Sequence, residues 1–231
     1  GKDPLADWDA HLANLEARRT WMTNQHFTSL HYTNSLGTDL TVGLPDNHIW
    51  QGGMEETASG ILFNANVPTE EIYSAPQADA VNGTVYSTRP LVYNGNTIDR
   101  FHLTFKDGKV VDAAAEIGED VLKKLVAVDE GAGRLGEVAL IPYASPISLS
   151  GILFYETLFD ENASCHLALG ASYPTCLKGG TELDKEGLSK AGLNDSMIHV
   201  DFMVGSKDLT ITGLKKDGTV VPVFTNGNWA E

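Results

Sequence analysis

The chain has 231 residues, of which 42% are hydrophobic and 20% charged, so it can build a substantial core in one large domain or two small ones. Sixteen basic residues against 31 acidic ones give a net charge of −15, which argues against a nucleic-acid partner, because such binding needs Lys and Arg to neutralise phosphates. The acidity is compatible with metal ions or with substrates that carry a free amine, although acidic side chains are usually just solvated surface. No apolar run of about 18 residues and no signal-peptide pattern occurs, so we expect no membrane partner.

Residues 4–23 predict an amphipathic helix that begins at Asp3-Pro4, a capping residue followed by a first-turn proline. Apolar side chains recur along it near helical spacing: Leu5, Trp8, Leu12, Leu15 and Met22. The chain begins with Gly1 rather than Met, so we interpret it as an expressed fragment or a processed product. The helix would then connect the rest of the chain to a segment that came earlier.

From about residue 26 to 115 the pattern changes to short segments rich in β-branched and aromatic residues, which are typical of strands. The expected strands are residues 27–33, 40–44, 84–93, 97–105 and 109–115. Asn-Gly and Asp-Gly pairs between them favour the tight turns of antiparallel hairpins.

The remainder predicts a helix over residues 117–129, a short helix near 182–191 and further strands. The expected strands here are residues 138–141, 199–205, 209–214 and 220–224. The sequence contains no repeat, no low-complexity tract and no internal Pro/Gly linker. These elements therefore predict an α+β fold, a single β-rich domain with mostly antiparallel strands and a few helices.

The two cysteines, Cys165 and Cys176, do not make a disulfide framework in a domain of this size, and a reduced, cytoplasmic setting is the default expectation. Cys165 precedes His166, which raises the question of a metal-ligand role for the thiol. Neighbouring residues on a strand point to opposite faces, so Cys165 should face away from any ion that His166 binds.

His199 and Asp201 are the strongest chemical signal in a single segment. Residues i and i+2 of a strand share a face, so both polar side chains would project together from an otherwise apolar strand. Burial of both without a partner would be costly. Two interpretations stay open on this evidence: a hydrogen-bonded His–Asp pair in the core, or a pair of metal ligands.

Further acidic and histidine residues occur in three other segments, and each is unremarkable alone. Glu71 follows Glu70 in a loop or edge strand between two prolines, Glu137 follows Gly136 at the start of an apolar strand, and His166 opens another apolar run. Taken together, two histidines and several carboxylates are what a pair of hydrolytic divalent ions requires, because imidazole suits zinc or cobalt and a carboxylate can bridge two ions.

These segments, in this order and spacing, resemble the thermophilic-type metallo-aminopeptidases, the family of aminopeptidase T, aminopeptidase S and PepS. The resemblance runs through nearly the whole chain. It is carried by residues 66–76, 136–137, 150–170 and 199–201. The family's full chain is longer and has an amino-terminal domain ahead of the first helix. The resemblance therefore implies a connecting helix at residues 1–25 and a metal-binding catalytic domain at residues 26–231.

The resemblance also implies a role for each site residue. Glu71 corresponds to a glutamate of the first ion, and Glu137 to a glutamate that bridges both ions. The ligands implied for the second ion are His166, His199 and Asp201. Glu161 would supply a further carboxylate, and Tyr173 matches a tyrosine of the same site.

The implied activity is the removal of single residues from peptides with a free amino terminus, by two divalent ions, zinc or cobalt, that activate a water molecule. Glu137 or Glu161 would move the proton, and Tyr173 would donate a hydrogen bond to the oxyanion. The resemblance further implies a homodimer for the full-length protein. Without the amino-terminal domain, the fragment is expected to be poorly active or inactive.

Two alternatives remain from the residues themselves. One is a different two-metal hydrolase such as a phosphodiesterase, against which stands the absence of Arg from the ligand segments. The other is a module that binds metal without catalysis. The remaining histidines are predicted to be structural or surface residues: His11, His26, His31, His48 and His102.

Overall fold

The first helix of the computed structural model, which describes residues 2–57 and 59–230, is α1 (Pro4–Gln25). Asp3 caps it by accepting a hydrogen bond from Ala6 N at 3.2 Å, and the helix ends at His26, which has a left-handed backbone. Its buried residues lie on one face: Leu12, Leu15 and Met22. The predicted helix is thus confirmed and extends two residues further, while Gly1 lies outside the described residues.

The larger sheet is antiparallel throughout and runs in the order β15-β14-β13-β1-β2-β6-β8, with both β7 and β9 paired to β8. Its strands are β1 (Phe27–Thr33), β2 (Asp39–Gly43), β6 (Val81–Tyr86), β7 (Leu91–Tyr93), β8 (Asn96–Lys106), β9 (Lys109–Ile117), β13 (Thr210–Lys215), β14 (Val220–Thr225) and β15 (Asn228–Trp229). One of the Asp-Gly pairs predicted to form a hairpin turn, Asp107-Gly108, joins β8 to β9.

The strand predicted over residues 84–93 is instead two strands, β6 and β7, separated by residues 87–90. Pro90 has no backbone N–H and cannot donate to a ladder, so the chain turns before it. Ser87 N still donates to Phe101 O of β8 at 2.9 Å, but Thr88 N donates to Met203 O at 2.9 Å, so the pairing with β8 ends there.

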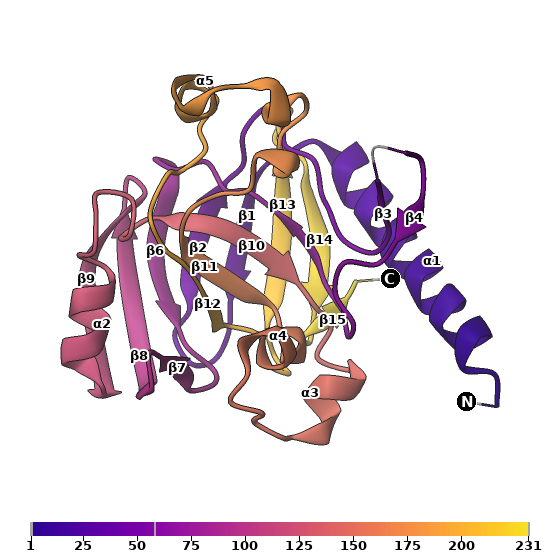
Figure 1. The fold of residues 1–231 in the computed structure, drawn as a ribbon. Helices are drawn as coiled ribbons and strands as arrows, with labels where there is room; N and C mark the ends of the chain where they lie inside the picture. The colour runs from indigo at the N-terminus through magenta and orange to yellow at the C-terminus, as the bar shows by residue number, and fades with distance from the viewer. Residues whose placement is uncertain (1, 58, 231) are drawn as a thin grey trace.

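The smaller sheet is also antiparallel and has the order β12-β11-β10-β5. Its strands are β5 (Ile72–Ser74), β10 (Leu135–Leu140), β11 (His166–Gly170) and β12 (His199–Met203). In Figure 1 it lies in front of the larger sheet, and one hydrophobic core joins the two. Phe101 of β8 and Phe202 of β12 meet across this core with ring centroids 5.7 Å apart. A separate hairpin, β3 (Glu55–Glu56) with β4 (Leu62–Phe63), lies beside α1.

Short helices connect the strands. They are α2 (Glu119–Leu125), α3 (Pro146–Ser150), α4 (Thr157–Asp160), α5 (Lys185–Lys190) and the 3-10 turns η1 (Glu161–Ala163), η2 (Pro174–Cys176) and η3 (Gly180–Glu182). Helices α2 and α5 lie within the predicted helical stretches. The sequence prediction missed α3, although Ser145-Pro146 carries a cap signal: Ser145 Oγ accepts from Ser148 N at 3.2 Å.

The observed architecture is the predicted one, a single α+β domain of mostly antiparallel strands. Among residues 2–57 and 59–230, no helix is both long and apolar enough to cross a membrane. The smaller sheet carries the polar cluster described next.

Candidate metal centre

One face of the smaller sheet collects the polar residues, and the register of its strands explains why. Glu137 of β10 is paired with Ala168 of β11, which is paired with Asp201 of β12. His166 and His199 lie two positions from members of this row on their own strands, so they share its face. The small side chain of Ala168 between the two carboxylates leaves room for an ion.

Glu71 reaches the same point from the edge of the sheet. It immediately precedes β5, whose first residue, Ile72, pairs with Leu140 of β10. The sequence placed Glu71 in a loop or edge strand, and it is the last residue before the edge strand.

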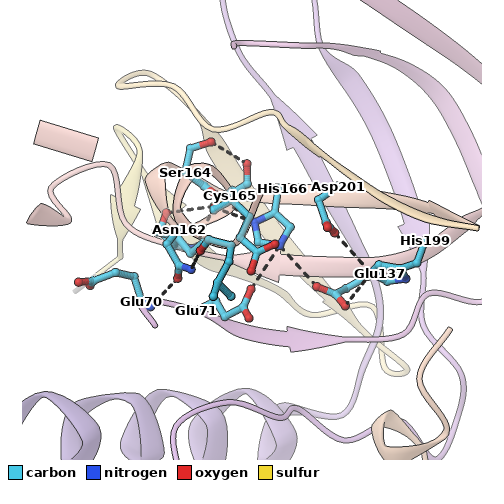
Figure 2. Close-up of polar contacts among 12 residues, drawn as sticks. Glu70, Glu71, Glu137, Asn162, Ser164, Cys165, His166, His199 and Asp201 are labelled. Carbon is cyan, nitrogen blue, oxygen red and sulfur yellow. Dashed lines mark hydrogen bonds and ion pairs between the residues drawn. The ribbon is translucent and has the colours of Figure 1, made fainter. Parts of the chain in front are cut away.

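The five side chains converge into two groups that share Glu137 (Figure 2). His166 Nε2 lies 3.2 Å from Glu71 Oε2 and 3.5 Å from Glu137 Oε1. His199 Nε2 lies 3.6 Å from Glu137 Oε2 and 3.4 Å from Asp201 Oδ1. Within each group, candidate ligand atoms lie no more than 4.8 Å from one another.

This grouping differs in one respect from the roles that the resemblance implied. His166 was expected with His199 and Asp201, but it lies against Glu71. The cause is its place at the first residue of β11: it pairs with Ala139 of β10, which in turn pairs with Tyr73 of the edge strand β5, two residues after Glu71.

The second nitrogen of each imidazole fixes its tautomer. His166 Nδ1 lies 3.0 Å from Glu161 O, and His199 Nδ1 lies 2.8 Å from Ala171 O. A carbonyl oxygen only accepts, so each Nδ1 must donate. In the neutral ring, each Nε2 then presents a lone pair to carboxylate oxygens, an arrangement that needs a proton or a metal ion between them.

The electrostatics of the cluster without metal follow from burial and mutual contact. Burial by itself would lower the pKa of His166, but the carboxylates of Glu137 and Glu71 outweigh it and raise that pKa well above its ordinary value. Burial would also lower the pKa of His199, but the carboxylate of Asp201 outweighs burial, and the pKa rises to about 9. Burial raises the pKa of Glu137 to about 7 even though His166 bonds to it. Without metal, raised pKa values favour protonated rings, whose Nε2 protons would lie where a cation would bind.

The residues present fit a divalent metal ion. Glu71 Oε2 is buried and makes no hydrogen bond of good geometry among the described residues; its one polar contact is the ion pair with His166 Nε2 at 3.2 Å, which leaves a buried carboxylate oxygen poorly satisfied. Imidazole nitrogen with carboxylate oxygen is a donor set that suits zinc or cobalt. One ion in each group would satisfy Glu71 Oε2 and the two Nε2 lone pairs.

A cavity of about 120 Å³ opens onto the cluster. It is lined by Asn66, Glu71, Tyr73, Glu137, Glu161, Tyr173, His199 and Asp201. Two larger cavities, of about 600 and 670 Å³, are lined by other residues and contain none of the predicted ligands.

Glu161 and Tyr173 line this cavity but belong to neither group of candidate ligands. Burial raises the pKa of the half-buried Glu161 to about 8 and that of Tyr173 to about 12. The Tyr173 side chain is exposed, and its ring lies 4.8 Å from the His199 ring between centroids. Both side chains are therefore placed at the wall of the site, beside the cluster.

Sequence reasoning missed Tyr73 and Asn66. The Tyr73 ring packs edge-on against Tyr173, with centroids 6.1 Å apart. Its position two residues after Glu71 would have indicated a shared face. Asn66 lies in a loop, and nothing in its sequence context marks it as a site residue.

Glycine allows the strands to approach closely beside the site. A Cβ added at Gly136 would lie 2.3 Å from Ala171 O and 2.4 Å from Gly170 O. The pairing of β10 with β11 shifts register at this residue. Gly136 therefore lets the strand of Glu137 pack closely against Ala171, whose carbonyl orients the His199 ring.

Cys165 points away from the cluster, as strand alternation predicted. Its buried thiol donates to Ile141 O at 3.3 Å, and burial raises the pKa of the thiol to about 12. Two of the remaining histidines make cross-strand pairs on the larger sheet that sequence spacing did not reveal, His31 with Asp39 at 2.7 Å and His102 with Asp112 at 3.0 Å. Both pairs are far from fully buried, in agreement with a surface role.

The fold and the site define a β-rich α+β domain that carries a buried histidine–carboxylate cluster of the kind found in metalloproteins. Residues 1–229 match the family described as thermophilic metalloprotease (M29), and the chain belongs to that family.

Several relatives are named aminopeptidases. The chain is 54% identical to aminopeptidase 2 from Geobacillus stearothermophilus and 53% identical to aminopeptidase AmpS from Bacillus subtilis, each over 99% of the chain and 55% of the relative. Aminopeptidase T from Thermus aquaticus is 45% identical over the same shares. The chain thus spans about half the length of the curated relatives that it matches.

Solved structures agree with the fold. AmpT from Thermus thermophilus superposes with a TM-score of 0.94 at 43% identity, over 99% of this chain and 56% of that one. A 2,5-dihydroxypyridine dioxygenase from Pseudomonas putida superposes with a TM-score of 0.62 at 13% identity, over 96% of this chain and 62% of that one. The second likeness shows a shared fold alone.

Proposed function

We propose that this chain holds the catalytic centre of a metal-dependent aminopeptidase with two divalent ions. The observation that carries the proposal is the sharing of Glu137 between two groups of candidate ligands. A carboxylate with one oxygen toward each histidine can serve two ions at once. The names of the relatives supply the reaction class, which is peptide hydrolysis from the amino terminus.

Glu71, Glu137 and His166 would hold one ion, and Glu137, His199 and Asp201 the other. Zinc or cobalt suits this donor set. Ions held there would supply Lewis-acid chemistry, namely a lowered pKa of bound water and polarisation of the scissile carbonyl.

Glu161 is the side chain that we assign to proton transfer. It lines the cavity, whereas both oxygens of Glu137 are directed at histidines. Burial raises the pKa of Glu161 to about 8 in the metal-free chain, but two cations beside it would favour the carboxylate form, which would accept the proton of the attacking water and return it to the leaving amine.

Tyr173 would donate a hydrogen bond to the oxyanion, because it lies at the exposed side of the same cavity and its phenol keeps its proton at neutral pH. The net charge of −15 favours a substrate that brings a positively charged amino terminus. Peptides with a free amino terminus are therefore the proposed substrates.

Several finer features stay predictions: a connecting helix at residues 1–25 ahead of a catalytic domain at 26–231, a homodimer of the longer protein, and a cytoplasmic setting. A second candidate function is metal binding with little turnover by this chain alone. It is favoured by the 55% share of the relatives that the chain spans, because the residues beyond that span could complete the peptide cleft.

Titration of zinc or cobalt into the metal-free chain, followed by assay on a leucine amide substrate, tests the proposal. Two ions per chain and metal-dependent release of leucine are expected. Fewer than one ion per chain would remove the metal centre altogether. Two ions without hydrolysis would favour the second candidate.

A further inference from the structure

The short loop that carries Glu71 is fixed on both sides of that residue. On one side, Glu70 N donates to Asn162 Oδ1 at 2.7 Å. On the other side, Ile72 enters the sheet by pairing with Leu140. Thr69 O also accepts from His11 Nε2 of α1 at 2.7 Å. The direction of the Glu71 carboxylate is therefore set by the backbone on either side of it.

Asn162 is the side-chain anchor of this loop, and both its amide oxygen and its amide nitrogen make hydrogen bonds. It is 1% exposed, and besides accepting from Glu70 N it donates from Nδ2 to Leu158 O at 2.8 Å. Figure 2 shows it between the Glu70 backbone and the turn that leads to His166. The amide thus joins two segments that are 92 positions apart in sequence.

The same turn fixes the other half of the ligand group. Asn162 follows Glu161 in η1, and Glu161 O accepts from His166 Nδ1 at 3.0 Å. One 3-10 turn therefore holds the loop of Glu71 through a side chain and the ring of His166 through a carbonyl.

We propose that Asn162 is a positioning residue for the ion held by Glu71, Glu137 and His166, an inference that rests on the proposed function. Glu71 Oε2 makes no hydrogen bond of good geometry among the described residues and has only the ion-pair contact with His166 Nε2 at 3.2 Å, so its direction depends on the backbone that carries it. Zinc needs a carboxylate oxygen within about 2.0–2.2 Å, so a loop displaced by even a fraction of an ångström would lose this ligand.

The effect should be confined to one ion. His199 and Asp201 lie on β12, and the His199 ring is oriented by Ala171 O rather than by η1. The ion that these two residues share with Glu137 does not depend on the Glu70–Asn162 bond. A positioning role therefore predicts one weakened binding step out of two, whereas a loss of folding would weaken both.

The test is calorimetric titration of zinc into the metal-free chain, at a temperature where every variant is folded. Asn162→Ala should weaken one binding step about 10–100-fold, the usual effect of losing a group that orients a ligand, and leave the other within about threefold. Asn162→Asp keeps an acceptor for Glu70 N–H and should recover most of the lost affinity.

Asn34→Ala is the matched control. Asn34 Oδ1 also accepts from backbone, from Leu36 N at 3.0 Å and Thr38 N at 3.1 Å, but on the hairpin between β1 and β2 of the larger sheet. This variant should lower the melting temperature and leave both zinc steps unchanged.

If both zinc-binding steps of Asn162→Ala were unchanged, or both were weakened equally, the positioning role would be overturned. The proposed function would still stand as long as the parent chain binds two ions. Equal affinities of the Ala and Asp variants would also overturn the positioning role. Fewer than one ion in the parent chain would overturn both proposals.

Discussion

Glu137 is the residue on which the proposed centre depends, because its two oxygens face different histidines, His166 at 3.5 Å and His199 at 3.6 Å. It is 5% exposed on a strand buried along its whole length, where an unpaired carboxylate would be costly. Partners of opposite charge, either protonated rings or metal ions, would offset that cost.

We predict that Glu137→Gln abolishes hydrolysis and leaves the fold intact. The amide keeps the size of the side chain but loses the charge that both ions would share, so both binding steps should weaken together. Zinc titration, circular dichroism and the leucine amide assay measure the three effects. Full activity with two bound ions in this variant would rule out the bridging role.

Glu161→Gln should separate proton transfer from metal binding. Glu161 lines the cavity without belonging to either ligand group, so its amide variant should bind two ions and lose about 10²–10⁴-fold in kcat, the usual contribution of a general base. Glu156→Gln, an exposed carboxylate in the same connection, is the control and should keep its activity. A loss of bound metal in Glu161→Gln would make Glu161 a ligand instead.

At the scale of elements, the site depends on loops that hold the strand ends in place, and Asp129 is the clearest case. It follows α2 and accepts hydrogen bonds from Ala132 N at 2.8 Å, Ser196 Oγ at 2.9 Å and Met197 N at 2.6 Å. It therefore fastens the turn before β10 to the segment that enters β12 at His199.

Because of Asp129, the free energy of unfolding should fall as the pH becomes acidic. The hydrogen bond from Met197 N, with those from Ser196 and Ala132, holds the pKa of Asp129 below its ordinary value. A group with a depressed folded-state pKa stabilises above its unfolded pKa, about 3.9, and loses that contribution as the pH falls through the folded value.

Asp129→Asn should therefore lower the free energy of unfolding at pH 7 and show less further loss on acidification below about pH 4. Urea denaturation at pH 7 and at acid pH measures this, with Asp9→Asn on the exposed face of α1 as the control. An unchanged acid dependence in Asp129→Asn would show that its hydrogen bonds contribute nothing.

Periodicity within each element made much of this predictable from sequence. The alternation in residues 199–201 placed His199 and Asp201 on one face, and the same rule turned Cys165 away from His166. The order of β5, β10, β11 and β12 was not predictable, because pairing between strands far apart in sequence is decided by the whole core. For the same reason the grouping of His166 with Glu71, rather than with His199 and Asp201, escaped prediction, and the carboxylate partners of His31 and His102 became visible only across strands.

The whole molecule is two antiparallel sheets on a shared core, with the ligand candidates on the smaller sheet. Every candidate ligand is within this chain, although the chain spans only 55% of the length of its relatives. Metal binding should therefore need no residue outside this chain, whereas positioning of a peptide could need the additional residues that the relatives have.

We expect this chain to bind metal but to turn over peptides slowly, because Tyr173 and Asn66 are exposed at the mouth of the cavity and loss of substrate positioning alone can cost orders of magnitude in rate. The comparison is hydrolysis of a leucine amide substrate by this chain and by full-length aminopeptidase T, at equal zinc or cobalt occupancy. Equal rates would show that the additional length of the relative contributes nothing to catalysis.

The most direct measurement of the central claim is anomalous scattering from crystals of this chain soaked in zinc and, separately, in cobalt. Two peaks are expected about 4 Å apart, the usual separation in two-metal sites, on either side of the Glu137 carboxylate. One peak should lie against Glu71 and His166, and the other against His199 and Asp201. A single peak, or peaks away from Glu137, would contradict the two-ion centre.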